Sequence, residues 1–166
     1  MDYLEAPEYL DYYPSPSIFL GGGITGCPDW QTKLVDLLKD ESNGILMNPR
    51  RKNFDIKNPN VTQEQITWEF KHLWEAECVV FWFCKETIQP IVLLELGARL
   101  AHHYLAKDSR ELTVPKILIG IEKGYPREQD VIVQTELAFG ATPVISDSLE
   151  HLAGRIKKEC FSDITF

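Results

Sequence analysis

Short apolar runs alternate along the chain with longer stretches in which apolar residues recur every three or four positions. The short runs predict buried strands, and the longer stretches predict amphipathic helices. We expect strands at residues 18–20, 45–47, 78–83, 116–121 and 143–145. Helices are expected at approximately residues 28–39, 62–76, 90–106, 129–139 and 148–159.

This regular alternation of strand and helix is typical of a parallel sheet covered by helices on both faces. Residues 17–166 therefore predict an α/β fold, a single doubly wound, flavodoxin-like domain with a five-stranded parallel sheet. Residues 1–16 are acidic and tyrosine-rich, and three prolines interrupt them. They predict an N-terminal arm without regular structure that packs on the body of the protein or on a neighbouring chain.

Charge and composition exclude several classes of partner. The net charge of -8 and the pI near 5.0 would repel a nucleic acid backbone or an anionic membrane surface. No apolar run approaches the roughly 18 residues of a membrane span, and no basic region precedes an apolar one at the N-terminus, so we expect a cytoplasmic protein. The four cysteines lack metal-binding spacing, so free thiols are expected, with neither a metal site nor a cofactor.

Two helix starts are marked in the sequence. Thr62 and Gln65 fit a capping box, and Pro90 suits the first position of a helix. Right-handed crossovers would place these two helices side by side on one face of the sheet. Their N-termini would then lie at the carboxyl ends of the strands, which is the edge where ligands bind in such sheets.

Glu69 and Glu95 are the strongest candidates for chemistry. Glu69 belongs to a predicted buried stripe with Ile66, Phe70 and Leu73, where a carboxylate is out of place. Glu95 lies at a similar depth in the next helix, so the two acids could face each other across a pocket. Such a pair suits glycosyl transfer, in which one carboxylate attacks the anomeric carbon and the other acid protonates the leaving group. Alternatively, one is a solvated edge residue and the other pairs with an arginine.

A glycine-rich turn follows the first strand of this domain. Gly21, Gly22, Gly23 and Gly26 formally satisfy the G-x-G-x-x-G pattern, which suits close approach to a phosphate or a ribose. For a dinucleotide site, the second strand lacks a ribose-binding acid, although Arg50 or Arg51 could receive a 2′-phosphate. The chain also has no room for a separate substrate domain. The remaining alternative is a tight strand-to-helix turn that binds no ligand.

Other candidates lie near the same edge. Trp68 is part of the predicted core, although an aromatic residue at the pocket edge could stack on a base. Arg127, Asp130 and Gln134 follow the fourth predicted strand and enter the next helix, so they belong to the ligand edge or to an ordinary loop and cap.

An ordered set of motifs between about Ser17 and Pro143 resembles the nucleoside 2-deoxyribosyltransferase family, particularly its 2-deoxyribosyltransferase-like branch. The motifs are Ile18 to Gly26, Asn48-Pro49-Arg50, Gln65-Ile66-Thr67-Trp68-Glu69, Phe81-Trp82-Phe83, Gln89-Pro90-Ile91, Glu95-Leu96-Gly97 and Tyr125-Pro126-Arg127 with Asp130-Val131. The resemblance implies that Glu95 is the nucleophile and that Glu69 contacts the base and assists its departure. It also implies a homo-oligomer in which a neighbouring subunit completes each pocket.

The chain departs from the family pattern at two positions. Phe19 stands where well-studied transferases have a tyrosine, and Gln89 takes the neighbourhood of an aspartate, as in related nucleotide hydrolases. From the motifs and the predicted edge together, we expect a small-molecule nucleoside or nucleotide substrate to be bound by Phe19, Gly21, Gly22, Gly23, Asn48, Trp68, Gln89, Arg127, Asp130 and Gln134.

Three functions remain open at this point. In the first, Glu95 attacks C1′, Glu69 protonates the base, and a second base accepts the 2-deoxyribosyl group. In the second, water takes the place of the acceptor base, which makes the protein an N-glycosidase of nucleosides or nucleoside monophosphates. In the third, the same fold serves as a non-catalytic nucleotide-binding sensor.

Overall fold

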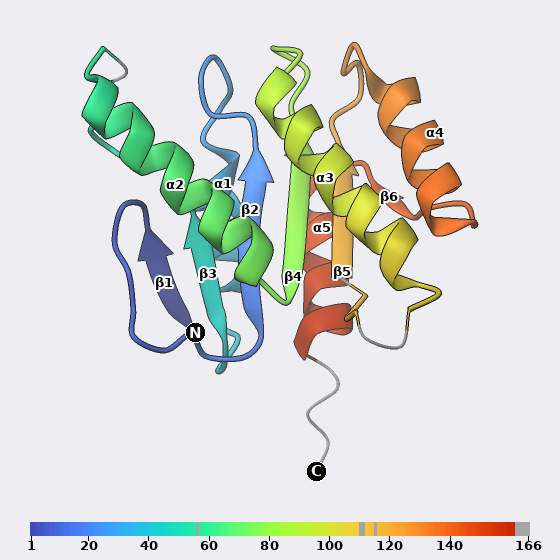
Figure 1. The fold of residues 1–166 in the computed structure, drawn as a ribbon, viewed down its shortest axis with the longest axis horizontal. Helices are drawn as coiled ribbons and strands as arrows, with labels where there is room; N and C mark the ends of the chain where they lie inside the picture. Colours follow the sequence, from blue (N-terminus) through green and yellow to red (C-terminus); the bar gives the residue numbers. More distant parts are fainter. Residues whose placement is uncertain (56, 110–111, 115, 162–166) are drawn as a thin grey trace.

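The computed structural model describes residues 1–55, 57–109, 112–114 and 116–161. Within these residues, six parallel strands form a single sheet between two layers of helices (Figure 1). The strand order is β1-β3-β2-β4-β5-β6. The predicted α/β fold with a parallel sheet is confirmed, whereas the predicted count of five strands is wrong.

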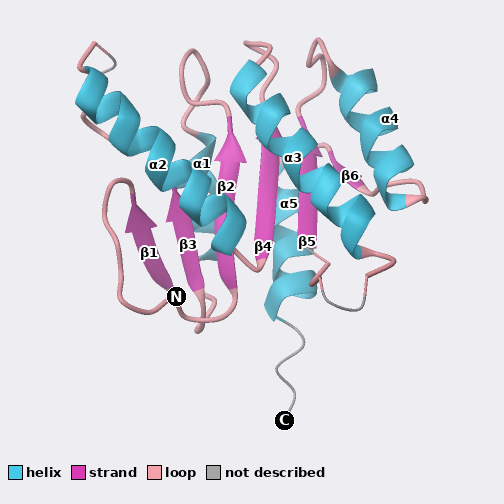
Figure 2. Ribbon diagram, in the orientation of Figure 1, coloured by secondary structure: helices cyan, strands magenta, loops and turns pink. Residues whose placement is uncertain are grey.

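The secondary structure is shown in Figure 2. The strands are β1 (Asp2–Glu5), β2 (Ser17–Gly22), β3 (Ile45–Asn48), β4 (Cys78–Phe83), β5 (Lys116–Ile121) and β6 (Ile145–Ser146). The helices are α1 (Trp30–Leu38), α2 (Pro59–Glu75), α3 (Pro90–Ala106), α4 (Glu128–Phe139) and α5 (Leu149–Ile156), and a π-helical turn (Lys157–Phe161) follows α5. Each of the five strands and five helices expected from the periodicity is present, with shifted ends in several cases.

The sixth strand comes from the segment predicted to lack regular structure. β1 pairs in parallel with β3, with Asp2 opposite Ile45, and buries Leu4. The rest of the arm packs along α2 of the same chain, where the indole N–H of Trp68 donates to the carbonyl oxygen of Glu8 at 2.6 Å. The N-terminal arm is therefore part of the folded body.

The start of α2 also differs from the prediction. The helix begins at Pro59, and the side chain of Asn58 caps it by accepting a hydrogen bond from the N–H of Asn60 at 3.1 Å. Thr62 lies inside the first turn and donates to the carbonyl oxygen of Asn58. Gln65 extends toward the sheet, so the predicted capping box does not form. α3 begins at Pro90, as predicted.

The crossovers determine where a ligand edge lies. α2, α3 and α4 cover one face of the sheet, and α1 and α5 cover the other (Figure 1). With the edge strand β1 set aside, the order β3-β2-β4-β5-β6 is the 2-1-3-4-5 order of a flavodoxin-like sheet. The chain reverses its winding direction between β2 and β4, so the carboxyl ends of these strands form the switch point. Among the described residues, no helix combines the length and apolar character needed to cross a membrane.

Two glycines allow a test of this packing. A Cβ atom on Gly120 in β5 would lie 2.4 Å from the Trp82 ring, whereas one on Gly154 in α5 would meet nothing within 4 Å. We expect Gly120→Ala to destabilise the protein by about 1–3 kcal/mol because it overpacks the core. Gly154→Ala should stabilise it by roughly 0.5–1 kcal/mol because alanine favours a helix interior. Chemical denaturation measures the free energy of unfolding of each variant. Equal changes in the two variants would contradict this packing of Gly120 and Gly154.

Candidate active site

Close packing at the end of β2 determines the shape of the switch point. A Cβ atom on Gly22 would lie 2.4 Å from the Trp30 ring, and one on Gly23 would lie 2.7 Å from Cδ of Gln89. A Cβ on Gly21 would lie 3.0 Å from the Phe81 ring. Contacts inside the protein therefore account for these glycines, and a ligand is not needed to explain them.

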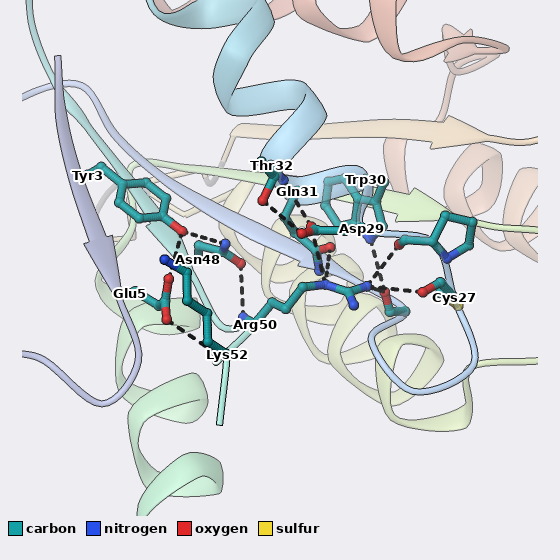
Figure 3. A network of polar contacts seen from close by, with 12 residues as sticks. Tyr3, Glu5, Cys27, Asp29, Trp30, Gln31, Thr32, Asn48, Arg50 and Lys52 are labelled. Carbon is teal, nitrogen blue, oxygen red and sulfur yellow. Dashed lines mark hydrogen bonds and ion pairs between the residues drawn. The ribbon is translucent and has the colours of Figure 1, made fainter. Parts of the chain in front are cut away.

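Arg50, which follows β3, holds the glycine-rich loop from one side (Figure 3). Its Nη2 donates to the carbonyl oxygens of Pro28 at 2.9 Å and Gly23 at 3.3 Å. Its Nε donates to Oε1 of Gln31 at 2.8 Å and forms an ion pair with Asp29 at 3.4 Å. The guanidinium is thus engaged by the chain itself, which argues against its use as a 2′-phosphate receptor in a dinucleotide site.

Asn48, at the end of β3, belongs to the same network (Figure 3). Its Oδ1 accepts from the N–H of Arg50 at 2.9 Å, and its Nδ2 donates to the hydroxyl of Tyr3 at 2.7 Å. The residue is buried. Asn48 was expected to bind substrate, and here it links β1 to the segment after β3.

Gln89 forms the junction between β4 and α3. Its backbone is left-handed, with φ of 55° and ψ of 61°. The buried side chain donates from Nε2 to the carbonyl oxygen of Cys84 at 2.6 Å, while Oε1 has no hydrogen-bond partner within the described residues. Gln89 therefore fixes the point where α3 starts, directly against Gly23.

Glu69 and Glu95 lie half-buried on α2 and α3. Burial raises the pKa of both carboxyl groups, and the charge of Glu69 adds to this effect at Glu95, whose pKa rises to about 8. In the part of the chain that the structure describes, no ion pair includes either glutamate. The structure thus brings the two acids within electrostatic reach of each other, and neither pairs with an arginine among the described residues.

This arrangement supplies a carboxylate beside a carboxylic acid. Because each charge disfavours the other, the two groups titrate as a pair. The pKa of Glu95 is raised to about 8, which favours its protonated form at neutral pH. One group available to donate a proton and one to attack is the combination that cleavage of a glycosidic bond uses.

The buried face of α2 differs from the predicted stripe. Ile66 and Phe70 are 60% and 65% exposed, whereas Gln65 and Trp68 are buried. Glu69 therefore lies at the edge of the buried face. Gln65, which the sequence analysis assigned to a cap, donates from Nε2 to Oε1 of Glu69 at 2.8 Å. Their spacing of four residues along a helix is the signal that could have indicated this contact.

Phe19 and Trp68 both lie in the hydrophobic core. Their ring centroids are 6.2 Å apart, and Trp68 also stacks on His72 at 4.0 Å. Both side chains are buried, at 1% and 0% exposure, so neither presents a free ring face to solvent.

Three expected substrate-binding residues lie on α4 or directly before it. Arg127 and Asp130 are exposed and form an ion pair at 3.0 Å. Asp130 and Gln134 line a groove of about 540 Å³ between α3 and α4, together with residues such as Gly97. Neither Glu69 nor Glu95 lines this groove. The groove that Asp130 and Gln134 line therefore does not include the side chains of the glutamate pair.

A family model described as nucleoside 2-deoxyribosyltransferase like matches residues 15–105. The match includes β2, both glutamates and Gln89, and it ends before Arg127, Asp130 and Gln134. No curated protein matches the chain.

The raised pKa of Glu95 predicts a pH-dependent stability. A carboxyl group whose pKa is higher in the folded state stabilises that state below its unfolded pKa, and this contribution is lost as pH rises through the folded value of about 8. We therefore expect Glu95→Gln, which cannot ionise, to raise the melting temperature relative to the parent by more at pH 8 than at pH 5. Thermal denaturation at both pH values measures the difference, with Glu75→Gln, an exposed site on α2, as the control. A pH-independent difference would contradict the burial of Glu95.

Proposed function

Because the chain belongs to the nucleoside 2-deoxyribosyltransferase-like family, we propose that it cleaves the N-glycosidic bond of a nucleoside or nucleotide and transfers 2-deoxyribose to another base. In this proposal Glu95 is the nucleophile and Glu69 is the general acid. The observation that carries it is the interacting pair of half-buried glutamates beside the switch point of the sheet.

The reaction proceeds by double displacement. Glu95 attacks C1′ while the C1′–N bond breaks, its electrons pass to the base, and Glu69 delivers a proton to a base nitrogen. Because the raised pKa of Glu95 favours its protonated form, its proton must first pass to Glu69, so that Glu95 attacks as a carboxylate and Glu69 has a proton to deliver. An acceptor base, with Glu69 now removing its proton, then displaces Glu95 from C1′ with net retention of configuration.

The glycosyl-enzyme formed in the first step can react either with an acceptor base or with water. If water resolves the glycosyl-enzyme, the protein is an N-glycosidase of nucleosides or nucleoside monophosphates. Incubation with deoxynucleosides and their monophosphates, with and without an acceptor base, separates the two, because only transfer yields a new nucleoside. Binding without any release of base would instead indicate a nucleotide-binding sensor.

Replacement of the nucleophile tests the proposal directly. Glu95→Ala should reduce base release by at least roughly 10³-fold, because the covalent step has no attacking group. Glu75→Gln should retain parental activity. Mass spectrometry of a slowly turned-over substrate should find a deoxyribosyl adduct on the peptide containing Glu95. Turnover by Glu95→Ala at the parental rate, or an adduct on another peptide, would refute the assignment.

We also propose that the protein is a homo-oligomer that associates through the layer of α2, α3 and α4. The large exposed apolar residues of the helices all lie in this layer: Ile66, Phe70, Trp74, Ile91, Leu94, Tyr104, Leu105, Val133 and Leu137. α1 and α5, both described in full, contain none. A cluster of exposed apolar residues on one layer of helices is typical of an interface, and the groove between α3 and α4 lies within that layer.

This assembly can be tested with a pair of charge substitutions. Phe70→Glu should convert the oligomer to monomer at micromolar concentration, because it buries a carboxylate in an apolar interface. Val144→Glu, at a position 61% exposed outside the three helices, is the matched control. Sedimentation velocity measures both. A parent protein that is monomeric, or a Phe70→Glu variant that remains assembled, would contradict the proposed interface.

A further inference from the structure

Gln65 is a buried amide that joins the sheet to one of the two glutamates. It lies on α2 one turn before Glu69 and is 6% exposed. Its Nε2 donates to the carbonyl oxygen of Pro49, just after β3, at 2.6 Å and to Oε1 of Glu69 at 2.8 Å. An amide nitrogen carries two hydrogens, so both are used, and two acceptors fix which end of the amide faces Glu69.

The hydrogen bonds described for the Gln65 side chain are made by its nitrogen, Nε2. Oε1 of Gln65 is buried and has no hydrogen-bond partner within the described residues. The strong contacts of the side chain are therefore those to Pro49 and Glu69. A helix cap would not bury the amide or direct it at a carboxyl group on its own helix.

We infer that Gln65 is the positioning residue of the general acid, holding Oε1 of Glu69 as an acceptor and leaving Oε2 to carry the proton that the departing base receives. This inference rests on the proposed function. In a protonated carboxyl group the carbonyl oxygen accepts hydrogen bonds and the hydroxyl oxygen donates. By donating to Oε1, Gln65 selects the other oxygen as the hydroxyl. When the C1′–N bond breaks, the proton leaves Oε2 for a base nitrogen, and Oε1 remains bonded to Gln65.

The second contact of the amide gives this orientation its stability. A glutamate side chain on a helix has several rotatable bonds. A hydrogen bond from another flexible side chain on the same helix would not by itself hold the carboxyl group in one orientation. Pro49 directly follows β3, so Gln65 links the carboxyl group to the backbone at the end of a sheet strand. A catalytic group held on such an element loses less rate to misplacement than one that is free to rotate.

Gln65→Met tests the inference, because methionine matches the length of glutamine and lacks N–H donors. We expect release of a natural base to slow at least tenfold, and release of an activated base, which needs little protonation, to change less than twofold. Combined with Glu69→Gln, the substitution should cause no further loss. Gln63→Met, at an exposed position on the same helix, should match the parent on both substrates.

The acidity of Glu69 supplies a readout that does not need activity. The hydrogen bond from Gln65 lowers the pKa of Glu69, so its loss should raise that pKa in Gln65→Met, as followed by ¹³C NMR of the carboxyl carbons. Gln63→Met should leave it unchanged. If the parent released no base from any nucleoside, the proposed function would fail while this titration still tested the contact. An unchanged Glu69 pKa, equal losses on both substrates, or a further loss in the Glu69→Gln background would overturn the inference.

Discussion

The contact between Gly23 and Gln89 fixes the geometry of the candidate site. A Cβ on Gly23 would lie 2.7 Å from Cδ of Gln89 and 2.3 Å from Sγ of Cys27, so the loop after β2 meets the start of α3 with no space for a side chain. Gln89 adopts a left-handed backbone here, at φ of 55°, which turns the chain into α3 immediately afterwards. The position of Glu95 in the second turn of α3 follows from this start. A longer or differently turned connection would move Glu95 relative to α2.

The electrostatics of the glutamate pair follow from the same packing. Burial is the first cause of the raised pKa of Glu95, and the charge of Glu69 is the second. A nearby cation would oppose both effects. Arg99 lies one turn beyond Glu95 but is buried with its guanidinium 5.5 Å from the Trp74 ring, and within the described residues no ion pair includes it. At Glu95, burial and the charge of Glu69 both raise the pKa, whereas at Glu69 the hydrogen bond from Gln65 opposes the effect of burial.

Much of the fold could be predicted from periodicity, and the exceptions have physical causes. β1 has four residues and buries only Leu4 among them, so it carries no repeating apolar signal, and its place depends on pairing with β3. The stripe on α2 was misplaced because Ile66 and Phe70 are apolar yet exposed. Gln65 and His72 are buried instead, and each bonds a residue distant in the sequence: Nε2 of Gln65 donates to the carbonyl oxygen of Pro49, and Nε2 of His72 bonds the hydroxyl of Tyr13. Periodicity alone cannot foresee such partners.

The sequence also indicated some residues of the candidate site better than others. Glu69 was selected because a carboxylate interrupted an apolar stripe, and it lies half-buried near Glu95 even though that stripe is partly exposed. Asn48 and the glycines were assigned to ligand binding, and the structure shows how strongly internal contacts occupy them. Local sequence indicates that a residue is unusual for its element, but a buried polar group and a ligand-binding group produce the same signal.

Glu69 and Glu95 lie on α2 and α3, two of the three helices that form the proposed interface. Assembly and catalysis are therefore linked in the proposed mechanism. Covering that layer with a second chain would remove water from both carboxyl groups and raise their pKa further. Glu95 must nevertheless ionise to attack. The charge that stabilises its carboxylate must therefore arrive with the substrate or with the neighbouring chain. The developing positive charge at C1′ in the transition state supplies such a charge at the atom that Glu95 attacks. A pair that resists ionisation in the empty protein is thus suited to act when an electrophilic sugar lies beside it.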